Sequence, residues 1–416
     1  MKSSRALAAA ALTLAALGGL APVPAFAGPA HAQDPASWRG ELVGDPVPLD
    51  TLTADQVRSV LSGDGRADGH IDPATVRYGV TTYRLTYRTL TPQGTPTAAT
   101  GLLVLPETGG HRRLDLVSDT HGTMVKRSYA PSAGEEFGRL SPLVQGSAGR
   151  AVAAPDYLGL GEGPGLHPYM DTASGVSASL DMLRAARTAA YALGRPVGHD
   201  VYATGFSQGG QVAMALAKQL DQGVDKRFRL KAVAPVSGPY DIEHTEMPAL
   251  FDGRVNDVSG VFYLSYWLVA QNRLHPLYKS PEDAFREPYA SRVESLFDGE
   301  HEEDAVVASL APSVRELLTP AFYERLRHPD GGLLAAMKAA DGTCDWKPAV
   351  PVRLYTATGD TDVPIANTRA CARQFAAHGV RARVVDQGAV GHNGAFMKSA
   401  PETVRFFDSV ARHGRG

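Results

Sequence analysis

The chain has 416 residues and a formal net charge of −3, with 44% hydrophobic and 20% charged residues. This composition excludes a disordered or fibrous chain, and the length fits one elaborated domain, or one domain with a large insertion, better than several independent units. No basic stripe is present, so we expect neither nucleic acid nor an anionic membrane surface as a partner.

Residues 1–32 have the pattern of an export signal. Lys2 and Arg5 supply positive charge ahead of an apolar run, and small residues at cleavage spacing then end at Ala27 or Ala32. The run is too short and too rich in small residues for a stable membrane anchor, and a buried N-terminal helix is the less favoured alternative. We therefore predict a cleaved signal peptide and a secreted protein, whose mature charge is near −5 because two positive charges are removed.

The next part of the chain begins with a segment rich in proline, glycine and aspartate, residues 33–48, which we predict to be irregular. Residues 53–61 fit a short helix capped by Thr53. Apolar and polar residues then alternate over residues 76–90, which predicts a β-strand, and residues 101–105 fit its hairpin partner.

Beyond this hairpin, short apolar strands alternate with helical patterns. The predicted strands are residues 114–118, 151–154, 201–205, 230–236, 352–356 and 382–385, and the predicted helices are residues 172–193, 209–220, 365–378 and 401–413. Such alternation predicts an α/β fold with a mostly parallel sheet and helices on both faces.

One long interval, residues 240–346, breaks the alternation because it holds several helical segments and no convincing strand. We predict a helical cap inserted between two strands, which divides the α/β core into residues 33–239 and 347–416. Within the cap, residues 258–269 are strongly apolar and aromatic, and they fit either a lid or acyl-chain tunnel or ordinary core packing.

Cys344 and Cys371 are the only cysteines. An oxidising compartment permits them to pair, and exported chains rarely keep spare thiols. We therefore predict a disulfide, with two buried free thiols as the alternative.

The motif with the most chemical content is Gly-Phe-Ser-Gln-Gly-Gly at residues 205–210, which places Ser207 in a Gly-x-Ser-x-Gly pattern. The pattern alone is weak in a chain this rich in glycine. Here it lies between a predicted strand and a predicted helix, where a sharp turn needs small neighbours and exposes the serine hydroxyl. This context favours a nucleophile over a serine in an ordinary glycine turn.

A serine hydroxyl is a poor nucleophile at neutral pH without a base. His392 is the best candidate, because it follows the last predicted strand on a glycine-flanked loop. A carboxylate after the strand at residues 352–356 would orient its imidazole, and Asp360 comes first there. Asp362 is the alternative acid, although it could instead cap the helix that begins near Pro364.

An oxyanion pocket needs two backbone N–H donors. We assign one to Gln208, directly after the nucleophile, and the other to the loop after the strand at residues 114–118. In that loop Thr123 is the first choice and Gly122 the second, and an ordinary glycine turn is the alternative.

The chain order Ser207, Asp360, His392 is that of α/β-hydrolases. The chain resembles this superfamily, in particular its secreted lipase and esterase branch with a helical cap, the lipase A-like secretory lipases. The resemblance extends from about residue 76 to the C-terminus and is carried by residues 121–123, 154–161, 167–169, 205–210, 359–364 and 391–393, while the cap matches nothing familiar. It departs at Ala357, because the superfamily commonly has glycine three residues before the acid.

The resemblance implies hydrolysis of small-molecule or lipid carboxylic esters through an acyl-enzyme, without a metal or other cofactor. No His/Cys cluster has metal-ligand spacing. One rival is a secreted serine peptidase of the prolyl type, in which Glu302 and Glu303 would supply carboxylates for a substrate amine. The other rival is a catalytically inactive binding module on the same fold.

Overall fold

The computed structural model describes residues 38–63, 69–109, 113–134 and 136–413. The predicted signal peptide therefore lies outside the described residues. The described residues form one compact unit, which contains both the sheet and the helical interval between β7 and β8.

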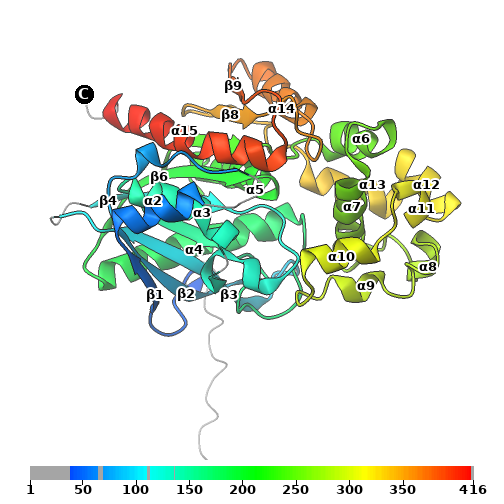
Figure 1. The fold of residues 1–416 in the computed structure, drawn as a ribbon, viewed down its shortest axis with the longest axis horizontal. Coiled ribbons are helices and arrows are strands. Elements are labelled where there is room, and N and C mark those ends of the chain that lie inside the picture. The colour runs from blue at the N-terminus through cyan, green and yellow to red at the C-terminus, as the bar shows by residue number, and fades with distance from the viewer. Residues whose placement is uncertain (1–37, 64–68, 110–112, 135, 414–416) are drawn as a thin grey trace, which may run out of the picture. The chain divides into compact units, whose positions relative to one another are not determined.

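In the described residues, one nine-stranded sheet runs in the order β1-β2-β3-β5-β4-β6-β7-β8-β9 (Figure 1). Its strands are β1 Val47–Leu52, β2 Val80–Leu90, β3 Pro96–Pro106, β4 Leu114–Thr120, β5 Ala151–Pro155, β6 Val197–Phe206, β7 Arg229–Val236, β8 Arg353–Thr356 and β9 Arg383–Asp386. β2 and β3 form the predicted antiparallel hairpin, and the pairs from β5 to β9 are parallel. The mostly parallel sheet is confirmed.

Six helices cover the two faces of this sheet, and each face has its own apolar core. One core joins the sheet to α2 Ala54–Ser62, α3 Glu136–Ser147 and α15 His392–His413. The other joins it to α4 Thr172–Ala192, α5 Gln208–Asp221 and α14 Ala366–Ala377. Thr53 caps α2 as predicted, by accepting a hydrogen bond from the backbone N–H of Gln56.

Four sequence predictions about these elements were wrong or incomplete. β1 lies at the end of the segment expected to be irregular, and most of its residues are exposed, so it lacks the alternation of a half-buried strand. β2 begins at Val80 and not at residue 76, because the backbone N–H groups of Arg77 and Tyr78 bond the carbonyl oxygen of Ser147. α3 was not predicted, and it contains Pro142. α15 begins at His392, with Pro401 inside it, whereas we took this proline for the first turn of the helix.

The interval between β7 and β8, which is called the cap below, consists of helices and loops, with one isolated antiparallel bridge between Phe285 and Leu318. It contains a π-helical turn at Ile242–Glu246 and the helices α6 Met247–Asp252, α7 Asp257–Asn272, α8 Pro281–Ala284, α9 Val293–Leu296, α10 Glu303–Ser309, α11 Val314–Leu317, α12 Pro320–Arg327 and α13 Gly331–Ala340. These helices share a third apolar core, in which α7 is buried on nearly every side. None of the helices in the described part of the chain has the length and apolar character needed to cross a membrane.

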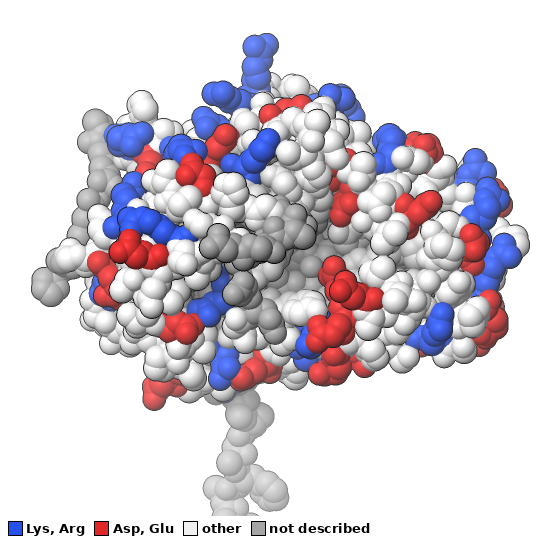
Figure 2. Space-filling model, in the orientation of Figure 1, with Lys and Arg blue, Asp and Glu red and all other residues white. Residues whose placement is uncertain are grey.

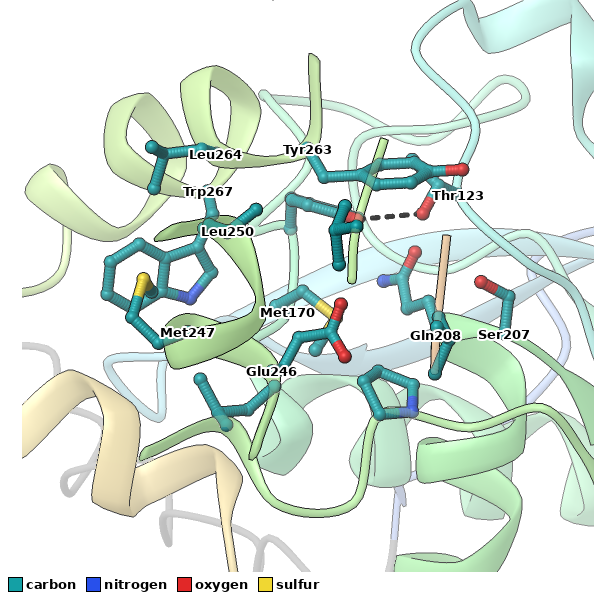
Figure 3. Close-up of a pocket in the computed structure, with 15 residues that line it drawn as sticks. Thr123, Met170, Ser207, Gln208, Glu246, Met247, Leu250, Tyr263, Leu264 and Trp267 are labelled. Carbon is teal, nitrogen blue, oxygen red and sulfur yellow. Dashed lines mark hydrogen bonds between the residues drawn. The ribbon is translucent and has the colours of Figure 1, made fainter. Parts of the chain in front are cut away.

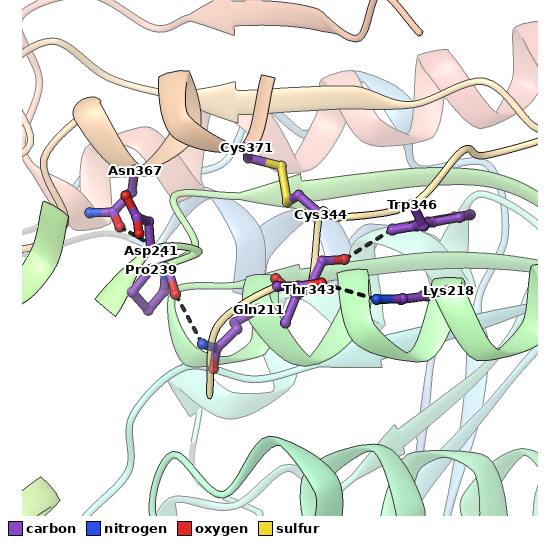
Figure 4. Close-up of a disulfide and its surroundings, with 10 residues drawn as sticks. Gln211, Lys218, Pro239, Asp241, Thr343, Cys344, Trp346, Asn367 and Cys371 are labelled. Atoms are coloured by element: carbon purple, nitrogen blue, oxygen red, sulfur yellow. Dashed lines mark hydrogen bonds between the residues drawn. A yellow bond between two sulfur atoms is a disulfide. The ribbon is translucent and has the colours of Figure 1, made fainter. Parts of the chain in front are cut away.

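A disulfide joins the end of this helical interval to α14, one of the helices that pack on the sheet. Cys344, after α13, is bonded to Cys371 on α14, so the predicted pairing is confirmed (Figure 4). Gln211 of α5 donates hydrogen bonds from its side-chain nitrogen to the carbonyl oxygens of Pro239 (3.0 Å) and Ala340 (2.9 Å). The two chain segments that connect cap and core are therefore both held against the helix that follows Ser207.

Candidate active site

Ser207 lies in the sharp turn between β6 and α5, with φ 57° and ψ −124°. This left-handed backbone conformation is strained for a residue with a side chain. The flanking glycines are required by space, because a Cβ on Gly205 would lie 2.2 Å from the hydroxyl of Thr120 and one on Gly209 would lie 2.0 Å from its carbonyl oxygen. Glycine is therefore required at both positions so that β6, α5 and β4 can pack closely. The resulting turn places the serine hydroxyl at the carboxyl end of the sheet.

His392 and Asp360 are in contact at the same end of the sheet. Nδ1 of His392 lies 2.8 Å from Oδ2 of Asp360, and both side chains are buried. The other carboxylate oxygen of Asp360 accepts the backbone N–H groups of Asp362 (3.0 Å) and Val363 (2.9 Å). Because a carboxylate only accepts, Nδ1 carries the proton, and Nε2 of a neutral imidazole is left with a free lone pair.

Ser207 and His392 are close in the fold but are not joined by a hydrogen bond. The ring of Phe206, the residue before the serine, packs on the His392 ring with centroids 4.5 Å apart. Nε2 of His392 is buried, and it has no hydrogen-bond partner among the described residues. Contacts of this kind are often long or misaligned in a free enzyme and shorten when substrate binds.

Asp362 faces the cap and not His392. Its carboxylate accepts hydrogen bonds from the Asn256 side-chain amide (2.9 Å), the Ser259 hydroxyl (3.0 Å) and the Tyr263 hydroxyl (3.1 Å), all at the start of α7. The expectation that Asp362 caps the following helix is wrong, because Ile365 precedes α14 and no side chain caps it. Asp362 therefore links the loop that carries Asp360 to the cap.

The residues assigned to an oxyanion pocket surround Ser207. Gln208 is the first residue of α5, and the N–H groups of a first helical turn have no partner within the helix. A Cβ on Gly122 would lie 3.3 Å from the Cβ of Ser207, so this loop passes directly over the serine. Thr123 lines the same pocket as Ser207, and its hydroxyl bonds the Tyr169 hydroxyl at 2.8 Å.

A buried polar network holds that loop from below. The Tyr157 hydroxyl donates to the carbonyl oxygen of His121 at 3.2 Å. Beside it, the fully buried carboxyl of Asp156 accepts from the Thr100 hydroxyl (2.6 Å) and from the backbone N–H of Ser132 (2.9 Å). Burial raises the pKa of Asp156. The Tyr157 contact ties the loop at residues 121–123 to the segment after β5, and the Asp156 contacts tie that segment to β3 and to Ser132.

The pocket above Ser207 lies between the sheet and the cap (Figure 3). Its free space is about 600 Å³, part of which is open to solvent. Tyr263, Leu264 and Trp267 of α7 form one wall, so the apolar segment of the cap both packs in the cap core and lines the pocket. The pocket also contains Glu246, which the sequence analysis missed because no motif surrounds it.

The acidic residues near α10 do not line this pocket. Acidic side chains gather near α10 on one face of the molecule (Figure 2). Among them, Glu302 bonds Lys126 and the Tyr129 hydroxyl, and Glu300 pairs with Arg127 at 3.3 Å. These ion pairs connect the cap to the loop after β4. In the described part of the chain, no three His, Cys, Asp or Glu side chains form a group that could hold a metal ion.

Comparison with solved structures gives matches along most of the chain. A protein from Legionella pneumophila assigned as a hydrolase is 26% identical with a TM-score of 0.80, covering 89% of this chain and 99% of that one. The rice cell wall degrading esterase LipA from Xanthomonas oryzae is 28% identical with a TM-score of 0.74, covering 88% and 95%. Candida antarctica lipase A in its closed state is 14% identical with a TM-score of 0.64, covering 91% and 84%, and it supports the fold alone.

No family model and no curated protein matches the chain. The solved structures nevertheless confirm the predicted α/β-hydrolase fold and the resemblance to its lipase and esterase branch.

Proposed function

We propose that this chain, which has the α/β-hydrolase fold, is an exported serine hydrolase that cleaves carboxylic esters. The observation that carries the proposal is the 2.8 Å contact between His392 and Asp360, both buried, beside a serine held in a strained turn. Ester hydrolysis is also the activity named for LipA, which matches 88% of the chain.

In the proposed mechanism, Nε2 of His392 takes the proton of the Ser207 hydroxyl while its oxygen attacks the ester carbonyl carbon. Asp360 holds the imidazole in the required tautomer and stabilises its cation. The oxyanion of the tetrahedral intermediate accepts hydrogen bonds from the backbone N–H groups of Gln208 and Thr123. The intermediate then expels the alcohol, which takes the proton from His392.

The second half of the cycle uses the same groups. A water molecule gives its proton to His392 and attacks the acyl-enzyme carbonyl, and collapse of the second intermediate releases the acid and restores Ser207. Gly122 is the alternative second oxyanion donor. This chemistry requires no metal or organic cofactor.

The export signal and the division into domains belong to the same proposal. Residues 1–32 would be removed during secretion, residues 33–239 and 347–416 would form the catalytic core, and residues 240–346 would form its cap. The helical character of the described part of that interval supports the last assignment.

The proposal is tested on the purified mature protein. A fluorophosphonate probe should label the wild type and not Ser207→Ala, and nitrophenyl butyrate should be cleaved far faster than a prolyl nitroanilide. Labelling that persists in Ser207→Ala contradicts the assignment of the nucleophile. Preference for the prolyl amide would make the protein a peptidase, and a wild type with neither labelling nor turnover would make it a binding module.

A further inference from the structure

The pocket above Ser207 contains one carboxyl group in largely apolar surroundings. Among its described lining residues, Glu246 is the sole Asp or Glu, and none is Lys, Arg or His. Asn367 of α14, which is completely buried, donates from its side-chain nitrogen to Oε2 of Glu246 at 2.5 Å. The carboxyl group is therefore held in place by a buried side chain of the core.

Gln208 contributes a second acceptor to the same pocket. Nδ1 of the buried His167 lies 2.9 Å from the carbonyl oxygen of Leu158, so Nδ1 carries the proton. Burial lowers the pKa of His167 to about 3, so the ring is neutral and its Nε2 accepts. The Gln208 side-chain nitrogen lies 3.1 Å from that Nε2 and must be its donor.

This arrangement fixes the orientation of the Gln208 amide. Its oxygen, Oε1, is buried and has no hydrogen-bond partner in the described structure, while the residue is 4% exposed and lines the pocket (Figure 3). An unpartnered buried acceptor is costly, and a ligand that donates a hydrogen bond removes this cost.

The charges around Glu246 are mostly negative. Burial, together with the nearby carboxylates of Asp360 and Asp362, raises its pKa to about 8, although the Asn367 hydrogen bond and Arg254 act in the opposite direction. Arg254 is itself paired with Asp252 at 2.7 Å. Tyr169 also interacts with Glu246, and its hydroxyl is uncharged because burial raises its pKa. A cation entering this pocket would meet favourable potential, whereas an anion would not.

We infer that this pocket binds the ammonium group of an amine-bearing ester, with the Glu246 carboxylate and the Gln208 side-chain oxygen as its acceptors. The inference rests on the proposed ester hydrolysis and names its substrate class. Tyr263 and Trp267 line the same pocket, and aromatic rings of this kind can attract cations at their faces. A neutral hydroxyl group could donate a hydrogen bond to the Gln208 oxygen equally well. Because it has no charge, however, the surrounding carboxylates would add little to its binding energy.

The test compares esters that differ in one terminal group. Nitrophenyl ω-aminohexanoate, ω-hydroxyhexanoate and heptanoate carry ammonium, hydroxyl and methyl ends of nearly equal size on the acyl side. Aminopropyl, hydroxypropyl and butyl butyrate do the same on the alcohol side. The measured quantity is the ratio of kcat/KM for the amine to kcat/KM for its methyl counterpart.

Glu246→Gln keeps an acceptor for Asn367 but removes the charge. We expect it to lower the amine-to-methyl ratio by about 10- to 100-fold in at least one series, the range for a hydrogen bond to a charged group. The matched control is Glu243→Gln, which removes the same charge three residues away, outside the pocket lining, and should leave the ratio unchanged. Equal effects of Glu246→Gln on all three end groups in both series, or a larger effect on the hydroxyl than on the amine, would overturn the inference.

The pH dependence gives a second readout. An ammonium ion binds the ionised carboxyl, so the amine-to-methyl ratio should rise as pH increases from 6 to 8, by at most about tenfold per unit, and Glu246→Gln should abolish this rise. A ratio in the wild type that is flat over this range contradicts the inference. Turnover of nitrophenyl heptanoate by the same wild-type sample tests the proposed ester hydrolysis independently. If this ester is cleaved while the ratio stays flat, the inference about the ammonium group is wrong and the proposed esterase activity is not.

Discussion

Exchanging Asp360, the proposed triad acid, for its amide tests the geometry of the proposed site most directly. In Asp360→Asn, the position of Oδ1 is already fixed, because two backbone N–H groups donate to it at 3.0 and 2.9 Å. The asparagine oxygen will take that position, and its NH₂ group will then face Nδ1 of His392. Nδ1 must become an acceptor, which moves the ring proton to Nε2 and leaves no lone pair for the proton of Ser207.

The magnitude follows from the distance in the structure. Unit charges separated by the 2.8 Å between His392 Nδ1 and Asp360 Oδ2 attract by about 6 kcal/mol at an effective dielectric constant of about 20. This attraction stabilises the imidazolium that forms in the transition state. Its loss corresponds to a decrease of about 10⁴-fold in kcat.

The matched variant is Asp362→Asn, two residues along the same loop. Asp362 accepts three hydrogen bonds from the start of α7 and none from His392. We expect kcat within about tenfold of the wild type and a stability loss of about 1–2 kcal/mol, the cost of one or two hydrogen bonds. Initial rates on nitrophenyl butyrate and thermal unfolding of both variants measure these effects. If Asp362→Asn lost the activity while Asp360→Asn kept more than a tenth of it, the assignment of the acid would be wrong.

Three further predictions concern the pocket, the disulfide and the serine turn. Trp267→Ala should lower kcat/KM for long acyl chains far more than for acetate, because Trp267 lines the pocket, and equal losses would assign it to packing alone. Replacing Cys344 and Cys371 by alanine should lower the free energy of unfolding by about 2–4 kcal/mol in denaturant titration, and an unchanged midpoint would contradict this. Gly209→Ala should cost about 1–3 kcal/mol or more and reduce activity, since its Cβ would lie 2.0 Å from a backbone oxygen of β4. Gly109→Ala, whose Cβ would meet no atom within 4 Å, should change neither quantity.

Much of the sheet was predictable because its signals are local. Buried strands such as β4 and β7 are short apolar runs, and α4 has apolar residues at helical spacing, so their patterns depend only on neighbouring residues. β1 was missed because an edge strand with exposed side chains has no such pattern. The start of α15 was misplaced because Pro401 is compatible with both the first turn and this helix interior.

For the candidate site, local sequence was sufficient to predict the sharp turn at Ser207, because that turn requires the glycines around it. The order of Ser207, Asp360 and His392 along the chain is visible in the sequence itself. The disulfide was also predictable, because the chain has only two cysteines. Which of Asp360 and Asp362 contacts His392 was visible only in the tertiary structure, because both lie on one loop and differ in the direction of the side chain. The same holds for Glu246, whose place beside Ser207 depends on how the cap packs on the sheet. Contacts between segments that are distant in the chain depend on how the elements pack in three dimensions. The residues that make such contacts show no periodic pattern in the sequence.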